Sequence, residues 1–172
     1  QNSQDEASRL TRGPAWGGDI ESGGNEKAED WPMYRRDPKR SGSTPAPLPT
    51  DLQKLWSRQI DGDVTPPVAA GGRICVAKTN EHTVVCMDAE DGSDLWHYTA
   101  GGPIDSPPTI YRGLVLFGCA DGRVYCLRAT DGKLVWRYRA APQERLIMVR
   151  GNLESAWPVH GSVLVQDGLA YV

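Results

Sequence analysis

Residues 88–96 read Asp-Ala-Glu-Asp-Gly-Ser-Asp-Leu-Trp, and residues 128–136 read Arg-Ala-Thr-Asp-Gly-Lys-Leu-Val-Trp. The two stretches share Ala, Asp-Gly and Trp at positions forty residues apart, and Trp56 lies another forty residues before Trp96. A fixed period of this length indicates a repeat protein, in which each unit buries its apolar surface against the next. The period therefore divides the chain into units that share one architecture.

Each unit contains four short segments with the composition of β-strands, separated by turns that contain glycine. The predicted strands are 65–70, 73–78, 83–88 and 94–99 in the first unit, and 106–111, 114–119, 123–128 and 134–139 in the second. Regular turn signals with β-branched and aromatic residues between them predict a four-stranded antiparallel meander. Four-stranded units of this length are the blades of β-propellers.

The sequence continues past these two units on both sides. Residues 52–60 carry Trp56 and are expected to form the outer strand of a last blade. A third unit starts with a strand at 162–166, turns at Asp167-Gly168 and stops inside a further strand. The predicted fold is all-β: a partial β-propeller with about two full blades and the start of a third. We expect the remaining blades to be missing from this chain, which would then be a fragment.

The repeated tryptophans have a structural explanation. A tryptophan on the outermost strand of a blade can pack its ring between neighbouring blades, which buries a large apolar surface. The structural repeat residues are Trp56, Trp96, Trp136, Gly92 and Gly132.

The first fifty residues differ in composition from the blades. Residues 1–30 hold seven acidic and three basic residues with few apolar positions, which predicts a disordered acidic, glycine-rich arm or linker. Residues 31–51 are expected to form an extended docking segment, with aromatics at its start and three prolines near its end. The propeller blades would then occupy residues 52–172.

Net charge and the length of apolar runs argue against nucleic-acid binding and against a transmembrane segment. The 172 residues carry a net charge of -3, with a pI of about 5.6, so no basic footprint for nucleic acid is present. No apolar run approaches the roughly 18 residues that a transmembrane helix needs. We therefore expect neither nucleic-acid binding nor a transmembrane segment.

The four cysteines are Cys75, Cys86, Cys119 and Cys126, without a CxxC pair or the spacing of a zinc site. A two-residue turn at Asp121-Gly122 would place Cys119 opposite Val124, and would thereby argue against a disulfide between the last two cysteines. We interpret the four cysteines as small apolar strand residues with free thiols, although their redox state stays open.

The repeat resembles a known family. Residues 88–96 and 128–136 are similar to the tryptophan-docking repeat of PQQ-type quinoprotein propellers, although Arg128 stands where that repeat has the aspartate matched by Asp88. The pattern Trp31-x-x-Tyr34-x-x-Asp37 also resembles the segment before the first blade of that family. The resemblance implies a propeller over residues 31–172 and a periplasmic or cell-envelope location.

The resemblance leaves the activity open, because the family contains both PQQ-dependent alcohol or sugar dehydrogenases and non-enzymatic assembly lipoproteins of the outer membrane. It allows PQQ with a calcium ion as a cofactor, held by Glu, Asn and Asp side chains, often beside a vicinal Cys-Cys pair. This sequence has no adjacent cysteines. We therefore assign no catalytic or metal-ligating residue and expect a binding or assembly platform, with the N-terminal part of a dehydrogenase as the alternative.

One loop is much longer than the repeat requires. We count the residues from each repeat tryptophan to the glycine in the turn between the first two strands that follow it. This spacing is 16 residues in the first unit, 17 in the second and 32 in the third. The insertion spans residues 140–161 and lies on the face that carries the longer loops, where functional residues concentrate. Neighbouring loops on that face carry Glu81, His82, Asp105 and Asp121.

The insertion holds six candidate residues for a partner protein or a small ligand: Arg145, Arg150, Asn152, Glu154, Trp157 and His160. The arginines suit carboxylate or phosphate groups, Asn152 and Glu154 offer oxygen ligands to a hard cation such as calcium, and Trp157 offers a stacking surface. Alternatively, the insertion is a cap in which Trp157 packs with residues 146–148 as a core of its own.

Overall fold

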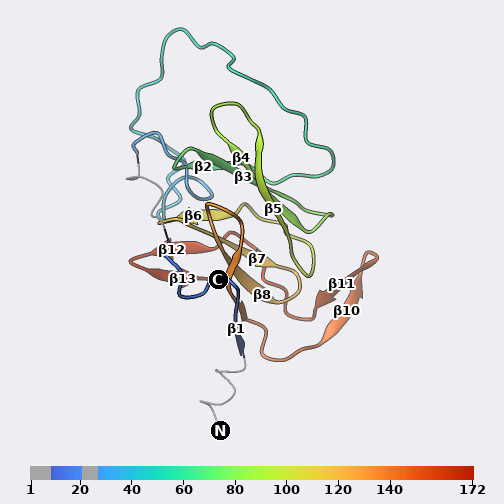
Figure 1. Ribbon diagram of the computed structural model, residues 1–172. Helices are drawn as coiled ribbons and strands as arrows, with labels where there is room; N and C mark the ends of the chain where they lie inside the picture. The colour runs from blue at the N-terminus through green and yellow to red at the C-terminus, as the bar shows by residue number, and fades with distance from the viewer. Residues whose placement is uncertain (1–8, 21–26) are drawn as a thin grey trace.

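Two antiparallel sheets of consecutive strands form the body of the computed structural model, which describes residues 9–20 and 27–172 (Figure 1). The strands of the first sheet are β2 (Val68–Ala70), β3 (Arg73–Lys78), β4 (Thr83–Asp88) and β5 (Asp94–Thr99), paired in chain order. Those of the second are β6 (Thr109–Tyr111), β7 (Leu114–Cys119), β8 (Arg123–Arg128) and β9 (Leu134–Arg139). Each sheet is one propeller blade, so the predicted all-β, partial-propeller fold is confirmed.

A fifth strand extends the second blade. Strand β1 (Leu10–Arg12) pairs antiparallel with the outer edge of β9, with Arg12 opposite Trp136. The guanidinium of Arg9 donates hydrogen bonds of 2.9 and 2.8 Å to the carbonyls of Arg139 and Ala140. The expected disorder of residues 1–30 is thus wrong for this part, because the free backbone groups of the β9 edge provide hydrogen-bond partners. Residues 1–8 and 21–26 lie outside the described residues.

The third unit is present as one hairpin. Strands β12 (Leu164–Gln166) and β13 (Leu169–Tyr171) pair antiparallel around Asp167 and Gly168, whose φ angles are 52° and 79°. Two consecutive positive φ angles are typical of the turn that matches the twist of a two-residue hairpin. The side chain of Thr109 in β6 donates a 2.5 Å hydrogen bond to the carbonyl of Val163, which attaches this hairpin to the second blade.

The apolar core lies between the blades. A buried cluster joins the first blade to the second, and it includes Cys75, Cys86, Phe117 and Tyr125, all at most 1% exposed. A second buried cluster lies on the opposite side of the second blade and includes Leu116 and Cys126 together with Val163 and Val165 of the third unit. Side chains that alternate along β7 and β8 therefore belong to different interfaces, as the two-residue strand period requires.

Trp96 closes the interface between the two blades. Its indole Nε1 donates a 2.8 Å hydrogen bond to the carbonyl of Ala129, and its ring lies against Gly132. Trp96 is 7% exposed, so this hydrogen bond is shielded from water. The repeated Ala-x-x-Gly turn of one blade is therefore the surface on which the tryptophan of the preceding unit packs.

Residues 52–60 differ from their predicted structure. They form no strand and no β-ladder with any other described segment. They belong to the long loop at the top of Figure 1. Leu52 and Leu55 are 74% and 86% exposed. Trp56 nevertheless donates a 3.1 Å hydrogen bond to the carbonyl of Ala89 and lies against Gly92. The packing of the tryptophan is retained while the strand is absent, because no described strand lies alongside to provide ladder hydrogen bonds.

The segment that follows residue 30 crosses the edges of both blades. Trp31 forms an antiparallel bridge with Ala69 of β2, and Ile110 of β6 donates a 2.7 Å backbone hydrogen bond to the carbonyl of Pro32. Met33 beside them is buried. The segment therefore connects the first strands of two successive blades.

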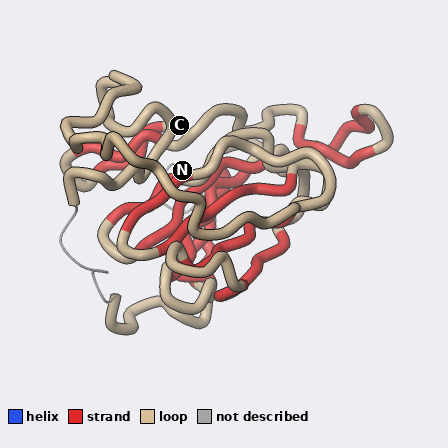
Figure 2. The backbone as a smooth tube through the Cα atoms, turned by 90° about the horizontal axis from the view of Figure 1, so that it is seen from above, coloured by secondary structure: helices blue, strands red, loops and turns tan. Residues whose placement is uncertain are grey.

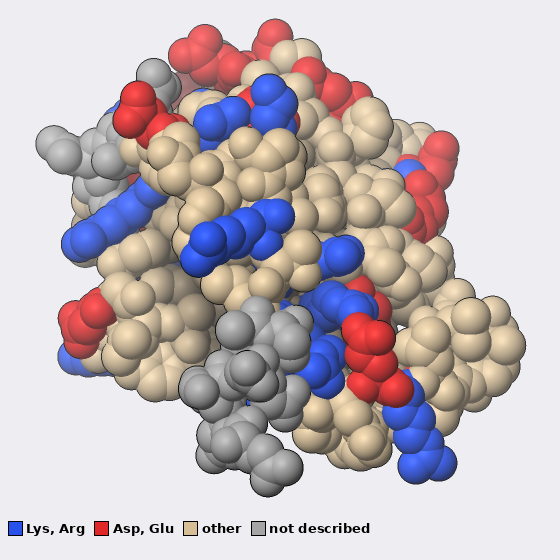
Figure 3. All heavy atoms as spheres, turned by 60° about the horizontal axis from the view of Figure 1, so that its bottom comes forward, with Lys and Arg blue, Asp and Glu red and all other residues tan. Residues whose placement is uncertain are grey.

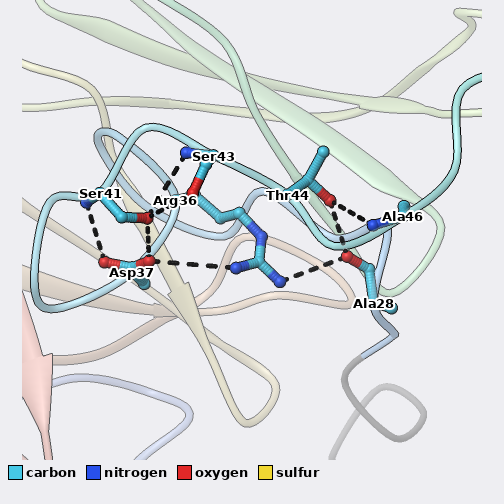
Figure 4. A network of polar contacts seen from close by, with 7 residues as sticks. All are labelled: Ala28, Arg36, Asp37, Ser41, Ser43, Thr44 and Ala46. Carbon is cyan, nitrogen blue, oxygen red and sulfur yellow. Dashed lines mark hydrogen bonds and ion pairs between the residues drawn. The ribbon is translucent and has the colours of Figure 1, made fainter.

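Polar contacts hold this segment in shape (Figure 4). The carboxylate of Asp37 accepts a 3.1 Å hydrogen bond from the backbone of Ser41 and a second one from its hydroxyl. The carbonyl of Ala28 accepts hydrogen bonds from Arg36 at 3.3 Å and from Thr44 at 3.1 Å. Side chains thus replace the backbone ladder that the segment lacks.

One predicted register is wrong. Cys119 lies opposite Arg123 rather than Val124, because the β7–β8 turn contains residues 120–122 instead of two residues. Gly122 has a φ of 82° and closes this longer turn. No helix of the described residues is long and apolar enough to cross a membrane.

Candidate functional site

The long insertion contains a β-hairpin that the repeat pattern does not predict. Strands β10 (Leu146–Val149) and β11 (Asn152–Ser155) pair antiparallel, and the chain reverses at Arg150 and Gly151, whose φ angles are 47° and 89°. Figures 1 and 2 both show the hairpin projecting from the body of the molecule. It is a two-stranded sheet of its own, separate from the blades.

The base of the insertion is attached to the β7–β8 turn of the second blade. The backbone of Ala141 donates a 3.0 Å hydrogen bond to the carbonyl of Gly122, and that of Ser155 donates one of 2.7 Å to Ala120. The backbone of Val159 donates a third bond, 3.1 Å long, to Cys119. These bonds attach both ends of the hairpin to a rigid blade.

Two glycines make this close attachment possible. A Cβ atom on Gly118 would lie 2.7 Å from Cγ1 of Val159, and one on Gly122 would lie 2.7 Å from Oγ of Ser155. Real Cβ contacts are longer than this, so any larger residue would push the insertion away from the blade. A glycine inside a strand is a signal of close backbone approach, and Gly118 in β7 could have revealed this contact in the sequence.

One face of the hairpin is apolar and exposed. Met148 lies opposite Leu153, and Leu146 lies two residues before Met148 on the same face. The exposed fractions of Leu146, Met148 and Leu153 are 58%, 68% and 56%. Ile147 and Trp157 are also exposed, at 41% and 37%, so the hypothesis that the insertion packs a core of its own is wrong. Two strands without a covering layer cannot bury both of their faces.

The six candidate residues do not converge on one point. Arg145 precedes β10 at the base, whereas Arg150 lies in the turn at the tip. Asn152 and Glu154 share the other face of β11. Trp157 and His160 follow the hairpin, where the backbone of Trp157 donates a 3.1 Å hydrogen bond to Oγ of Ser155. The six candidate residues are therefore spread over an extended surface.

His160 contacts the neighbouring interblade loop. Its Nδ1 atom lies within hydrogen-bond distance of a carboxylate oxygen of Asp105, and both side chains are exposed. The backbone of Gly161 donates a 2.9 Å hydrogen bond to Oγ of Ser106. The end of the insertion is thereby attached to the β5–β6 loop as well as to the β7–β8 turn.

A buried carboxylate lies beneath the insertion. Asp121 is 8% exposed and accepts hydrogen bonds from the hydroxyl of Tyr125 at 2.5 Å and the backbone of Arg123 at 3.0 Å. Burial, and then the hydrogen bond to Asp121, raise the pKa of Tyr125 above its ordinary value. The guanidinium of Arg123 lies 3.6 Å from Asp121 and 2.6 Å from Glu144 of the insertion.

Asp121, Arg123 and Glu144 line a small cavity of about 90 Å³ at the base of the hairpin. Of the six candidate residues, Arg145 alone reaches it, beside Asp121, Arg123 and Glu144. Its volume is too small for an organic cofactor, since ligand pockets are typically about 300 Å³ or more. The cavity is therefore part of the attachment of the insertion.

A sequence comparison identifies the family. Residues 46–170 match the family described as outer membrane protein assembly factor BamB. The chain belongs to this family. A 71-residue stretch is 32% identical to the outer membrane protein assembly factor BamB of Burkholderia pseudomallei, covering 41% of this chain and 18% of that protein. The chain thus spans less than a fifth of the curated BamB relative that it matches.

Solved structures confirm the propeller fold of this BamB-family chain. A quinohemoprotein alcohol dehydrogenase from Pseudomonas putida has a TM-score of 0.67 and 18% identity, over 88% of this chain and 25% of that one. The corresponding enzyme from Comamonas testosteroni has a TM-score of 0.62 and 21% identity, over 82% and 22%. At these identities the similarity shows the fold alone.

A PQQ–calcium site would need several oxygen donors around one point. Within residues 9–20 and 27–172, no group of three or more His, Cys, Asp or Glu side chains is placed to hold a metal ion. Asn152 and Glu154 supply two donors on a half-buried hairpin face. The described part of this BamB-family chain therefore brings no three such side chains together around a PQQ–calcium site.

Proposed function

We propose that this BamB-family chain is a non-catalytic propeller module that serves as a binding and assembly platform, contacting a partner protein through the β10–β11 hairpin. The observation that carries the proposal is the apolar strip of Leu146, Met148 and Leu153, exposed on a hairpin whose base is attached to a blade. The name of the Burkholderia relative, outer membrane protein assembly factor, supports this role and a location in the cell envelope.

The energetics favour protein binding at this strip. Complete burial of one such side chain stabilises a complex by about 1.5–3 kcal/mol, so the three together suffice for the centre of an interface. Binding also costs free energy when mobile loops must be ordered. The backbone bonds from Ala141 and Ser155 to the β7–β8 turn lower that cost, because they hold the base of the hairpin before the partner arrives.

Charges at the ends of the strip indicate what the partner presents. Arg145 and Arg150 lie at the two ends of β10, and both are exposed. The lobe at the right of Figure 3, the side on which the hairpin projects in Figure 1, has few charged side chains. We expect the partner to offer an apolar surface flanked by carboxylates, which would pair with the arginines at the rim.

The test is site-specific photo-crosslinking in cells that express the full-length protein. A crosslinker at Met148 should capture one defined partner, whereas the same crosslinker at Leu95, an exposed residue of β5, should not. The purified partner should then bind the protein at least tenfold more weakly when Leu146, Met148 and Leu153 are all changed to Ser. Ile147→Ser on the opposite face is the matched control. Equal affinity of the triple variant and the unmodified protein would disprove the role of the strip.

A further inference from the structure

Two cysteines lie directly opposite each other in the first blade. Cys75 of β3 pairs in register with Cys86 of β4, and their Sγ atoms are 3.1 Å apart. Both side chains are fully buried in the interface with the second blade. The repeat does not require this pair, because the second blade has Leu116 opposite Cys126 at the corresponding place.

The backbone geometry of the pair suits a covalent bond. The backbone of Ala89 donates a 3.0 Å hydrogen bond to Gly72, so Gly72 and Ala89 are a hydrogen-bonded pair of the β3–β4 ladder. Hydrogen-bonded and non-hydrogen-bonded pairs alternate along an antiparallel ladder. Cys75 and Cys86, three positions further, are therefore a non-hydrogen-bonded pair, in which Cα atoms approach to about 4.5 Å. That separation lies within the range that a disulfide spans.

We propose that Cys75 and Cys86 form a cross-strand disulfide. The thiolate of one cysteine attacks a disulfide oxidant, either a thiol–disulfide oxidoreductase or glutathione disulfide, and expels one thiol of that oxidant. The second cysteine then attacks the mixed disulfide, closes the Cys75–Cys86 bond and releases the other thiol. Two protons and two electrons leave the protein, and the oxidant is reduced to two thiols.

The reaction takes place before the blades have packed together. In the folded protein both thiols are completely buried, so an oxidant cannot reach them. The hydrogen bond to Cys86, followed by burial, raises the pKa of Cys75 well above its ordinary value and suppresses the reactive thiolate. Once the second blade covers the pair, the same burial shields the disulfide from reductants.

The other two cysteines provide an internal control. Cys119 belongs to the cluster between the first and second blades, whereas Cys126 belongs to the cluster on the opposite side of the same sheet. Their side chains therefore point away from each other across the sheet. Cys119 donates a 3.3 Å hydrogen bond to the carbonyl of Gly102. We expect both to remain thiols under conditions that oxidise Cys75 and Cys86.

The test is to refold the full chain in a glutathione redox buffer, unfold it without reductant, alkylate the free thiols and digest with trypsin. Cleavage after Lys and Arg leaves the four cysteines in four separate peptides, 74–78, 79–112, 113–123 and 124–128. The expected result is a reductant-sensitive link between peptides 74–78 and 79–112, with the other two peptides alkylated. Four alkylated peptides, or a link between any other pair, would overturn the proposal.

Variants add a second readout that does not depend on peptide mapping. Reductant during refolding should lower the melting temperature of the unmodified chain and of Cys126→Ala. It should leave the melting temperature of the Cys75→Ala/Cys86→Ala double variant unchanged. A double variant that responds to reductant as strongly as the unmodified chain would contradict a disulfide at this site.

Discussion

The indole of Trp96 lies against Gly132 of the next blade, so closely that a Cβ atom there would come within 2.6 Å of the ring atom Cε3. The same indole donates its hydrogen bond to Ala129, three residues before that glycine. Gly132 has a φ of 69°, which a residue with a side chain rarely adopts. The glycine thus serves two purposes: it closes the turn and leaves room for the tryptophan of the preceding unit.

Gly132→Ala should therefore destabilise the protein by about 3 kcal/mol, because strain at positive φ adds to the overlap with Trp96. Gly72 is the matched control, since its φ is 73° and no atom lies within 4 Å of its added Cβ. Gly72→Ala should cost about 1 kcal/mol, from the backbone alone. Urea denaturation of both variants measures the difference, and equal losses would show that the tryptophan contact contributes nothing.

Gly118→Ala should loosen the insertion without straining the turn of the blade. The added methyl group overlaps Val159 and weakens the hydrogen bonds that Val159 donates to Cys119 and Ser155 donates to Ala120. We expect at least tenfold faster amide hydrogen exchange at these two residues. Gly151→Ala at the tip meets no atom within 4 Å and should leave both rates unchanged. Unaltered exchange in Gly118→Ala would contradict the attachment.

Tyr125→Phe should destabilise the protein by about 1–2 kcal/mol, because it removes a donor from the buried carboxylate of Asp121. Tyr98 is the control, since it packs edge-on against Phe117 and its hydroxyl makes no hydrogen bond with a described residue. Tyr98→Phe should change the free energy of unfolding by less than about 0.5 kcal/mol. Thermal or urea unfolding distinguishes the two, and a loss in Tyr98→Phe as large as that in Tyr125→Phe would count against the pairing.

Asp131 should make stability depend on pH in the acid range. Hydrogen bonds of 2.9 and 2.6 Å from the Arg128 guanidinium lower the pKa of Asp131 well below its ordinary value. A lowered folded-state pKa stabilises the protein above the unfolded value of about 3.9, and this contribution is lost as the pH falls below it. Asp131→Asn should lower the free energy of unfolding by about 1 kcal/mol at pH 7 and by less at pH 3. The value is small because Asp131 is partly exposed to solvent.

The control for this prediction is the corresponding turn of the first blade. Asp91 also has a lowered pKa, through hydrogen bonds with Ser93, but no arginine holds it. The effect of Asp91→Asn should therefore be smaller than that of Asp131→Asn and less sensitive to salt. Urea titrations from pH 7 to pH 3 provide the comparison. A destabilisation by Asp131→Asn that grows as the pH falls would contradict the assigned ion pair.

Local sequence signals predicted the blades well. The bounds of β3, β4, β5, β7, β8 and β9 agree with the predicted strands, because alternating apolar residues and Asp-Gly turns are local and recur in each unit. The one-residue error at Cys119 arose because the β7–β8 turn contains three residues and not the two that Asp121-Gly122 alone would supply. Residues 52–60 and 10–12 were misassigned for a related reason, since strand formation requires a partner edge that the segment itself does not reveal.

The spacing between tryptophan and glycine located the insertion at residues 140–161, but the role of its residues depends on contacts with distant segments. Asp105 binds His160 across 55 positions of the chain, and Gly118 packs against Val159. Sequence alone determined the propeller fold, the repeat and the place of the irregular loop, because each follows from local periodicity. Only the tertiary structure decided which face of the hairpin is exposed and which cysteines meet, because register and burial depend on what lies alongside each strand.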